Sequence, residues 1–488
     1  MTPLERPVCD QAVRDRVTGD LGTTFLVEAS AGTGKTRVLV DRYVNCVLDP
    51  EDGAGDVRRV AAITFTEKAA GELRQRIRER FEALAAEARV AAQGEAQDPT
   101  PGAGSGDSVA IRRALDYLDD APIGTIHGFA GRLLREYAVE AAIDPAFEQL
   151  DQLAGELERG RLWDEWLSEL ASGAGESEPA EVARVRDWLG RLLAIGVRLD
   201  ALRRLAIGPG GAFSERYDLD PAPEPPAPPE VLGRLRDLSA ASAALRHYCQ
   251  QACVNHSDAG FCTAMELVEG LDACAAWIDE TGGSCRVEEQ MARLQALPLK
   301  TGPKGPGGIM KNWAVDQGGK GEFVDRYKAL ADEVALLRDE YAAHVAALAV
   351  AVADAFARWA GTQQLAQGQL DFTDLLGQLR NMLATNLSAR GELQRRLRYV
   401  LVDEFQDTDP LQAESVLLLC EREPQAADWR HVELEPGKLF VVGDPKQSIY
   451  RFRRADIALY DEVKELIQAQ PEGKGTSVAI EQNFRTTP

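Results

Sequence analysis

The sequence of 488 residues contains little positive charge, few cysteines and few aromatic side chains. Lys and Arg number 55 against 78 Asp and Glu, and the formal net charge of −23 argues against a broadly basic nucleic-acid-binding surface, although it leaves room for a local groove. Eight cysteines at irregular spacing are unlike a disulfide scaffold and indicate a reducing compartment. Met1–Val17 is charged and lacks the apolar core of a secretion signal.

Long apolar runs are also scarce, since no stretch approaches the roughly 20 apolar residues of a transmembrane helix. We therefore expect a cytoplasmic protein without a membrane partner. Five cysteines do gather between residues 249 and 285, with His247 and His256 nearby. Among these residues, His247, Cys249, Cys253 and His256 could ligate Zn²⁺. The i, i+4 spacing of the two cysteines instead favours small core residues of a helix.

The sequence does contain a candidate phosphate-binding loop. Residues 29–36 read Ala-Ser-Ala-Gly-Thr-Gly-Lys-Thr and follow the apolar run Thr24–Val27, as in a strand that enters a Gly-rich turn and then a helix. Backbone N–H groups of such a turn converge on phosphate oxygens, Lys35 reaches the β- and γ-phosphates, and the Thr36 hydroxyl ligates Mg²⁺. The candidate nucleotide-binding residues of the loop are Ala29, Ser30, Ala31, Gly32, Thr33, Gly34, Lys35 and Thr36.

The loop departs from the usual pattern at one position, where Ala29 replaces the first glycine. Alanine also leaves room for close approach of the backbone, so we interpret the loop as a variant. Gly32 and Gly34 stand where a positive φ or a close phosphate contact is expected. The alternative interpretation is a plain strand–turn–helix corner without a ligand.

A second candidate site lies far downstream. Tyr399–Val402 is a continuous apolar run, typical of a buried parallel strand, and it ends in Asp403 and Glu404. A carboxylate at the carboxyl end of such a strand lies where Mg²⁺-nucleotide binds in open α/β sheets. We expect Asp403 to hold the metal, directly or through water, and Glu404 to orient and deprotonate the attacking water.

These segments resemble motifs of superfamily 1 DNA helicases of the UvrD/Rep type. Residues 403–409, Asp-Glu-Phe-Gln-Asp-Thr-Asp, are similar to the Walker B motif of that family, and most similar to its RecB/AddA branch, the motor subunits of helicase-nuclease complexes. Other motifs follow in the expected order. They are residues 63–70 and 124–129, which resemble DNA-contacting motifs, 370–376, which resembles the segment before Walker B, 442–453, which resembles the coupling motif, and 482–486, which resembles the arginine motif.

The resemblance implies further roles around a bound ATP. Gln11 matches the glutamine that reads adenine, and a carboxamide offers the donor and acceptor that adenine N7 and N6 require. Arg37 and Phe484 match positions that sandwich the adenine ring. Gln447 matches the γ-phosphate sensor, and Arg485 matches a cation on the transferring phosphoryl group.

The resemblance also implies a site for single-stranded DNA, in which aromatic side chains stack on bases. The matching residues are Thr64, Phe65, Thr125, His127, Tyr450, Phe452 and Arg453. Core packing is the alternative for Phe65, and a buried, satisfied histidine is the alternative for His127. A run of arginines over residues 74–80 could contact DNA or form a solvated helix face with Glu72 and Glu79.

The fold expected from these observations is α/β. It is a P-loop NTPase (RecA-like) parallel sheet with helices on both faces, interrupted by a large, mostly α-helical insertion. We expect residues 1–140 and 369–488 to form the two parts of the RecA-like domain, and residues 141–368 to form the insertion, with one long helix over Tyr327–Gln367. The family's second RecA-like domain and a nuclease domain are not recognisable in residues 1–488, so we interpret the sequence as an N-terminal part.

The predicted function is an ATP-dependent DNA helicase or translocase motor that uses ATP and Mg²⁺. It would move along single-stranded DNA and unwind duplex DNA in double-strand-break repair or recombination, and its partner would be a second helicase-nuclease subunit. The alternative is a non-catalytic, ATP-dependent module that binds DNA or a partner without unwinding. Lys35 and Glu404 favour the motor because both catalytic groups are present.

Overall fold

The computed structural model describes residues 10–50, 55–94, 105–173, 179–208, 225, 230–281, 286–300, 305–426, 428–447 and 457–484. The chain divides into two compact units, one formed by Met1–Gln152 with Leu365–Pro488 and the other by Leu153–Gln364. The divisions fall near the domain boundaries expected at residues 140 and 368, which stay predictions.

The first unit is built on a parallel sheet that has six strands within the described residues, in the order β3-β2-β6-β7-β1-β8. Strands β2, β6 and β7 are buried along their whole length, as expected for a sheet covered on both faces. The predicted parallel α/β fold is therefore confirmed. The strands are β1 (Thr24–Ala29), β2 (Val60–Thr64), β3 (Ile123–Thr125), β6 (Tyr399–Val402), β7 (Leu439–Gly443) and β8 (Gly475–Ile480).

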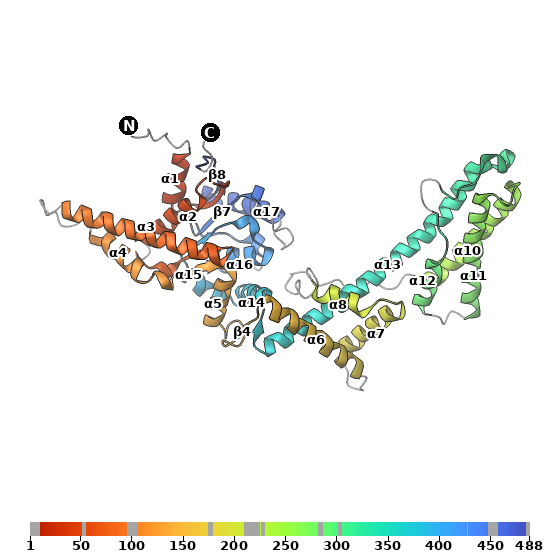
Figure 1. The fold of residues 1–488 in the computed structure, drawn as a ribbon, viewed down its shortest axis with the longest axis horizontal. Coiled ribbons are helices and arrows are strands. Elements are labelled where there is room, and N and C mark those ends of the chain that lie inside the picture. The colour runs from red at the N-terminus through yellow and green to blue at the C-terminus, as the bar shows by residue number, and fades with distance from the viewer. Residues whose placement is uncertain are drawn as a thin grey trace. The chain divides into compact units, whose positions relative to one another are not determined.

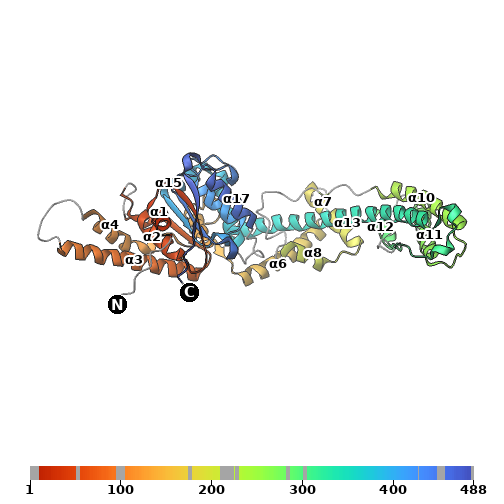
Figure 2. The same ribbon diagram turned by 90° about the horizontal axis from the view of Figure 1, so that it is seen from above.

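Helices cover both faces of this sheet (Figure 2). On one face, α1–α4 pack their apolar residues against alternate strand residues such as Phe25, Tyr399 and Phe440. On the other face, α17 contacts β1 and β8, and α14 packs against α5 and α16. The helices are α1 (Gln11–Gly19), α2 (Lys35–Leu48), α3 (Glu67–Gly94), α4 (Ser105–Asp116), α5 (Ile126–Glu136), α14 (Phe372–Thr385), α15 (Leu387–Arg396), α16 (Pro410–Cys420) and α17 (Ile457–Gln468).

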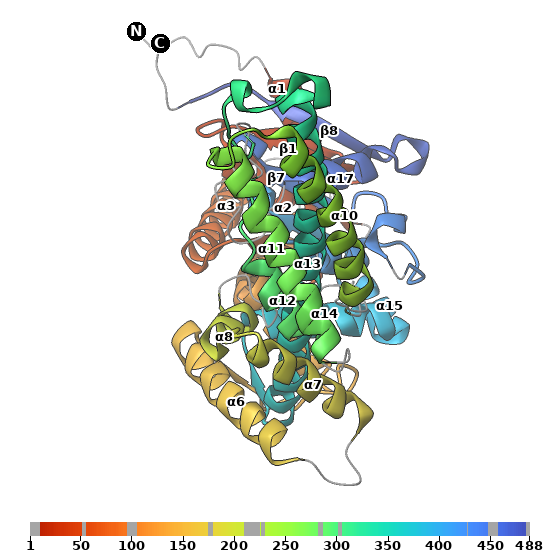
Figure 3. The ribbon, with the colours of Figure 1, turned by 90° about the vertical axis from the view of Figure 1, so that its right-hand side faces the viewer.

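The second unit is helical, and α13 (Gly319–Ala366) runs through its length (Figure 1). The first part of α13 packs with α10, α11 and α12 around Phe323 and Tyr327, and α10 and α11 lie along it in Figure 3. The last part packs with α6, α7 and α8 around Phe356 and Trp163. The other helices are α6 (Gln152–Ser172), α7 (Ala180–Ala194), α8 (Leu199–Ile207), α10 (Val231–Ala252), α11 (Ala259–Glu280) and α12 (Val287–Gln295).

The long helix corrects one sequence expectation. By length and composition alone, Val315–Ala366 could cross a membrane, and the mean hydropathy of its most apolar window is 1.3. The expectation that no stretch approaches that length was wrong because the helix supplies buried side chains to two successive cores of the helical unit. Within the described ranges, no second helix is long and apolar enough to do the same.

Three of the four described cysteines of the second unit lie in its core. Cys249, Cys253 and Cys274 are buried in the cluster around Phe323, whereas Cys262 is exposed. In the part of the chain that the structure describes, no group of three or more His, Cys, Asp or Glu side chains is arranged to hold a metal ion.

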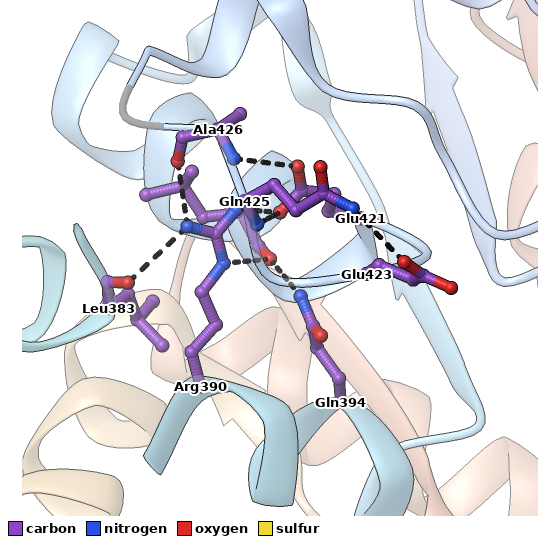
Figure 4. Close-up of polar contacts among 8 residues, drawn as sticks. Leu383, Arg390, Gln394, Glu421, Glu423, Gln425 and Ala426 are labelled. Atoms are coloured by element: carbon purple, nitrogen blue, oxygen red, sulfur yellow. Dashed lines mark hydrogen bonds and ion pairs between the residues drawn. The ribbon is translucent and has the colours of Figure 1, made fainter. Parts of the chain in front are cut away.

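A buried guanidinium joins three helices on one side of the sheet (Figure 4). Arg390 in α15 donates to the carbonyl oxygens of Leu383 and Leu418, near the ends of α14 and α16, and to that of Ala426 at 2.8 Å. It also forms an ion pair with Glu421, whose carboxylate accepts the backbone N–H of Ala426 at 3.0 Å. Arg390 therefore satisfies carbonyls that the helix ends leave unpaired.

We predict that Arg390→Met lowers the free energy of unfolding by about 3–5 kcal/mol, because Glu421 would stay buried without its counter-ion. Arg395→Met is the matched control, since Arg395 is exposed on the same helix, and it should change stability by less than about 0.5 kcal/mol. Urea denaturation of both variants measures the difference. Equal stability of the two variants would show that the buried pair is dispensable.

Candidate nucleotide-binding and catalytic site

The candidate phosphate-binding loop forms the turn between β1 and α2. Gly32 has a φ of 82° and Gly34, which precedes the first residue of α2, has a φ of 84°. The predicted left-handed glycines are therefore confirmed, and a side chain at either position would be strained. The Thr33 hydroxyl donates to the carbonyl oxygen of Ser30 at 2.7 Å and so closes the turn. Lys35 and Thr36 begin α2, whose N-terminal amides favour an anion.

The two acidic residues after β6 lie opposite this loop. Lys35 Nζ is 2.9 Å from Glu404 Oε2, which joins groups 369 residues apart in the sequence. Glu404 has a left-handed backbone with a φ of 52°, which costs energy for a residue with a side chain. Asp403 Oδ1 accepts the N–H of Glu404 at 3.0 Å, and Gln406 Nε2 donates to Glu404 Oε2 at 2.7 Å. These bonds hold the carboxylate toward Lys35.

The acids outnumber the cations at this point. Burial raises the pKa of Asp403 to about 6, and the charge of Glu404 adds to the effect while Lys35 opposes it. Burial and Glu404 also raise the pKa of Asp407 to about 6, and its Oδ1 has no hydrogen-bond partner among the described residues. Desolvated carboxylate oxygens suit a hard divalent cation. Mg²⁺ bound with a nucleotide needs only one or two of them, so Asp403 and the Thr36 hydroxyl fit this role.

A pocket of about 390 Å³ lies beside the loop. Its lining includes Gln11, Arg37 and Phe484, the three residues expected around adenine, together with Gly34. Phe484 is 57% exposed, and its backbone N–H donates to the carbonyl oxygen of Gly32 at 2.8 Å. Gln11 Nε2 donates to Asp15 at 2.6 Å. The arrangement offers an open aromatic face and a carboxamide next to the phosphate-binding turn.

Sequence reasoning missed the two residues that hold this pocket together. The Asp10 carboxylate accepts the N–H groups of Glu481 and Gln482 at 2.9 and 3.1 Å, and it also pairs with Arg14 at 2.7 Å. The Arg14 guanidinium lies 5.2 Å from the centre of the Phe484 ring. Burial raises the pKa of Asp10, but the hydrogen bonds from Arg14 and the two amides outweigh burial and lower it overall. The i, i+4 spacing of Asp10 and Arg14 was the available signal.

The segment after β7 also reaches this site. Gln447 donates its side-chain amide to the Asp444 carboxylate, and the Asp444 N–H donates to Gln406 Oε1 at 2.8 Å. Gln447 therefore connects to Glu404 through Asp444 and Gln406, two residues that the sequence did not single out. Four expected site residues lie outside the described residues and stay predictions, namely Tyr450, Phe452, Arg453 and Arg485.

A family model described as the UvrD/REP helicase N-terminal domain matches residues 10–202 and 308–468, which is more than half of the chain. The chain belongs to this family. The resemblance drawn from the motifs is therefore confirmed.

Curated relatives of this UvrD/REP chain carry names that describe each of them as one subunit of an ATP-dependent helicase/nuclease. The chain is 29% identical to the protein from Moorella thermoacetica, in an alignment that covers 95% of this chain and 33% of the relative. It is 27% identical to the protein from Bacillus pumilus and 29% identical to that from Geobacillus kaustophilus, each over 95% of this chain and 37% of the relative. The chain thus spans about a third of the length of the curated relatives it matches.

The residues expected to contact DNA have mixed surroundings. Phe65 is partly exposed and lines a small cavity with Thr64, Asp403 and Glu404. The Thr64 hydroxyl is buried and has no hydrogen-bond partner among the described residues. The Thr125 hydroxyl already makes two hydrogen bonds within the protein. It donates to Glu67 at 2.7 Å and caps α5 by accepting the N–H of Gly128.

His127 and the arginine run over residues 74–80 have partners within the protein, and the contact of His127 with DNA stays a prediction. The His127 ring packs edge-on against Phe372, with 5.2 Å between the ring centres. In the arginine run, Arg74 donates to the carbonyl oxygen of Ile123 at 2.5 Å, Arg78 pairs with Asp119 at 2.9 Å, and Arg80 pairs with Asp41 at 3.2 Å. These arginines join α3 to neighbouring segments, with partners other than the glutamates expected from the sequence.

We predict that Asp10→Ala accelerates hydrogen–deuterium exchange at the amides of Glu481 and Gln482 by about tenfold or more. Hydrogen bonds to a charged acceptor are worth about 1.5–3 kcal/mol, and these amides would lose theirs. Asp15→Ala is the control on the same helix, and it should leave the two amides unchanged. Slow exchange in Asp10→Ala would mean that the carboxylate does not hold this strand end.

Proposed function

We propose that this chain is the ATP-binding motor portion of a DNA helicase that hydrolyses ATP to move along single-stranded DNA and unwind duplex DNA. One observation carries the proposal: Lys35 of the phosphate-binding loop contacts Glu404 at the end of β6, beside a pocket lined by Gln11, Arg37 and Phe484. The candidate base pocket, the candidate phosphate-binding loop and the carboxylate that we propose as general base are adjacent, as adenine, phosphates and attacking water would require.

ATP would place its base between Arg37 and Phe484 and its phosphates against the amides of residues 30–36. Lys35 would turn from Glu404 toward the β- and γ-phosphates, where it meets more negative charge. Glu404, freed from its ammonium partner, would then accept a proton from the attacking water. Mg²⁺ held by Thr36 and Asp403 would supply charge neutralisation at the β- and γ-phosphates. Gln447 and Arg485 keep the roles of sensor and phosphoryl-binding cation that the family resemblance implies.

We further propose that Phe65 and Phe452 stack on bases of the DNA strand, with Thr64, His127, Tyr450 and Arg453 beside the backbone. The Thr125 hydroxyl is already bonded, so its contribution to DNA binding would come from the backbone at the start of α5. The relatives are named for a helicase/nuclease of more than one subunit, which supports a partner protein of that kind and a role in DNA repair. We expect this assembly in the cytoplasm.

The alternative function is an ATP-dependent clamp that binds DNA or a partner without turnover. The clamp would need the base pocket and the phosphate loop but no aligned general base. The contact between Glu404 and Lys35 favours the motor, because it brings a carboxylate within 2.9 Å of the lysine that we expect to bind the γ-phosphate. DNA-stimulated release of phosphate separates the two functions.

We predict that Lys35→Ala abolishes measurable binding of Mg²⁺-ATP to this chain. Lys474→Ala, which changes an exposed lysine at the other end of the sheet, should leave binding intact.

Glu404→Gln should keep ATP binding, because it preserves the shape of the side chain. In the protein that contains this chain, it should lower DNA-stimulated hydrolysis by about 10²–10⁴-fold, the usual contribution of a general base. Calorimetry and phosphate release measure the two effects. Near wild-type turnover in Glu404→Gln would remove Glu404 from the mechanism.

A further inference from the structure

Both polar atoms of the Gln406 side-chain amide form hydrogen bonds, which join the segments that follow β6 and β7. It is 6% exposed and lies in the 3-10 turn Phe405–Asp407 directly after Glu404. Its Nε2 donates to Glu404 Oε2 at 2.7 Å, and its Oε1 accepts the backbone N–H of Asp444 at 2.8 Å. The orientation of the amide is fixed by these partners, since a carboxylate needs a donor and an N–H needs an acceptor.

Asp444 carries this contact into the segment after β7. It is 4% exposed, and its carboxylate accepts the Lys446 N–H at 3.1 Å and the side-chain amide of Gln447. The Gln447 N–H donates to the Asp444 carbonyl oxygen at 2.9 Å, so residues 444–447 form a tight turn. Gly443 leaves the space for the bridge, because a Cβ there would lie 2.9 Å from Gln406 Oε1.

The other end of the bridge meets the phosphate-binding loop. Glu404 Oε2 accepts hydrogen bonds from both Lys35 Nζ and Gln406 Nε2. A continuous series of contacts therefore runs from Lys35 through Glu404, Gln406 and Asp444 to Gln447. Removing Lys35 from Glu404 would leave a carboxylate with more unbalanced charge, which strengthens its remaining hydrogen bond from Gln406.

We propose that Gln406 is a positioning residue that transmits the state of the Lys35–Glu404 contact to the turn at residues 443–447. The inference rests on the proposed function, because nucleotide phosphates are what withdraw Lys35 from Glu404. When the phosphates bind Lys35, Gln406 moves with the Glu404 carboxylate. This movement alters the length of the hydrogen bond between Gln406 Oε1 and the Asp444 N–H. Gln447 then responds to nucleotide in two ways: directly, through its own side chain, and indirectly, through the contacts from Glu404 to Gln406 and Asp444.

Hydrogen–deuterium exchange of the whole chain, with and without Mg²⁺ and a non-hydrolysable ATP analogue, tests the proposal. In the wild type, the analogue should slow exchange in residues 30–36 and change exchange in residues 443–447 by about five- to tenfold, the scale of one hydrogen bond. Gln406→Met should still bind the analogue and keep the protection of residues 30–36, but lose the response at residues 443–447.

Two further variants separate transmission from simple support of the turn. Gln394→Met is the matched control, because Gln394 is also a buried glutamine, whose Nε2 donates to the Leu418 carbonyl oxygen away from this series. It should keep the full response. Gln406→Asn adds no charge beside Glu404 and keeps an amide, but its side chain is one methylene shorter and cannot span Glu404 and the Asp444 N–H together, so it should fold and still lose the response.

The outcomes are distinguishable. If the wild type neither binds the analogue nor protects residues 30–36, the proposed function fails. If it binds and protects the loop, but residues 443–447 either do not respond or respond equally in Gln406→Met, the role of Gln406 is wrong. If Gln406→Met fails to fold, Gln406→Asn decides, and a wild-type response in that variant overturns the proposal.

Discussion

The candidate site exists because β7 lies between β1 and β6 in one parallel sheet, so the carboxyl ends of the three strands meet at a single edge. Each strand delivers one part there: β1 leads into the phosphate-binding loop, β6 into Asp403 and Glu404, and β7 into Asp444 and the turn that follows. The contact between Lys35 and Glu404, and the bridge through Gln406, depend on this strand order. A different order would separate the same motifs.

A second pair of strands explains how the helical unit is inserted without disturbing the sheet. The chain leaves the first unit after β4 (Glu148–Gln149) and returns through β5 (Gln369–Leu370), and these two short strands pair in parallel. The pairing holds the exit and the return together, so the long excursion between them costs the sheet little beyond loop closure. Strands β6 and β7 can therefore complete a sheet that β1 and β2 began far earlier in the sequence.

Features set by local chemistry were predictable from the sequence. The apolar runs predicted the positions of β1 and β6, and Gly32 and Gly34 predicted the left-handed turn. Strands and turns of this kind depend on a few neighbouring residues. The family motifs correctly grouped Gln11, Arg37 and Phe484, which line one pocket. The roles of the site residues in binding and catalysis stay predictions.

Features set by distant partners were not predictable. Nothing near Gln406 or Asp10 in the sequence indicates that each binds a backbone N–H of a segment far along the chain. Nothing near Thr125 in the sequence indicates that its hydroxyl binds Glu67, and its place at the DNA stays a prediction. Arg74, Arg78 and Arg80 look like part of a basic face in the sequence, but each has a partner in a distant segment.

A structure of this chain with Mg²⁺ and a non-hydrolysable ATP analogue would be the most direct test of the nucleotide site. We expect Lys35 Nζ within hydrogen-bonding distance of the β- and γ-phosphates and no longer on Glu404, with the base between Arg37 and Phe484. A bound nucleotide that leaves the Lys35–Glu404 contact intact, or that places its base outside the pocket, would contradict the proposed site.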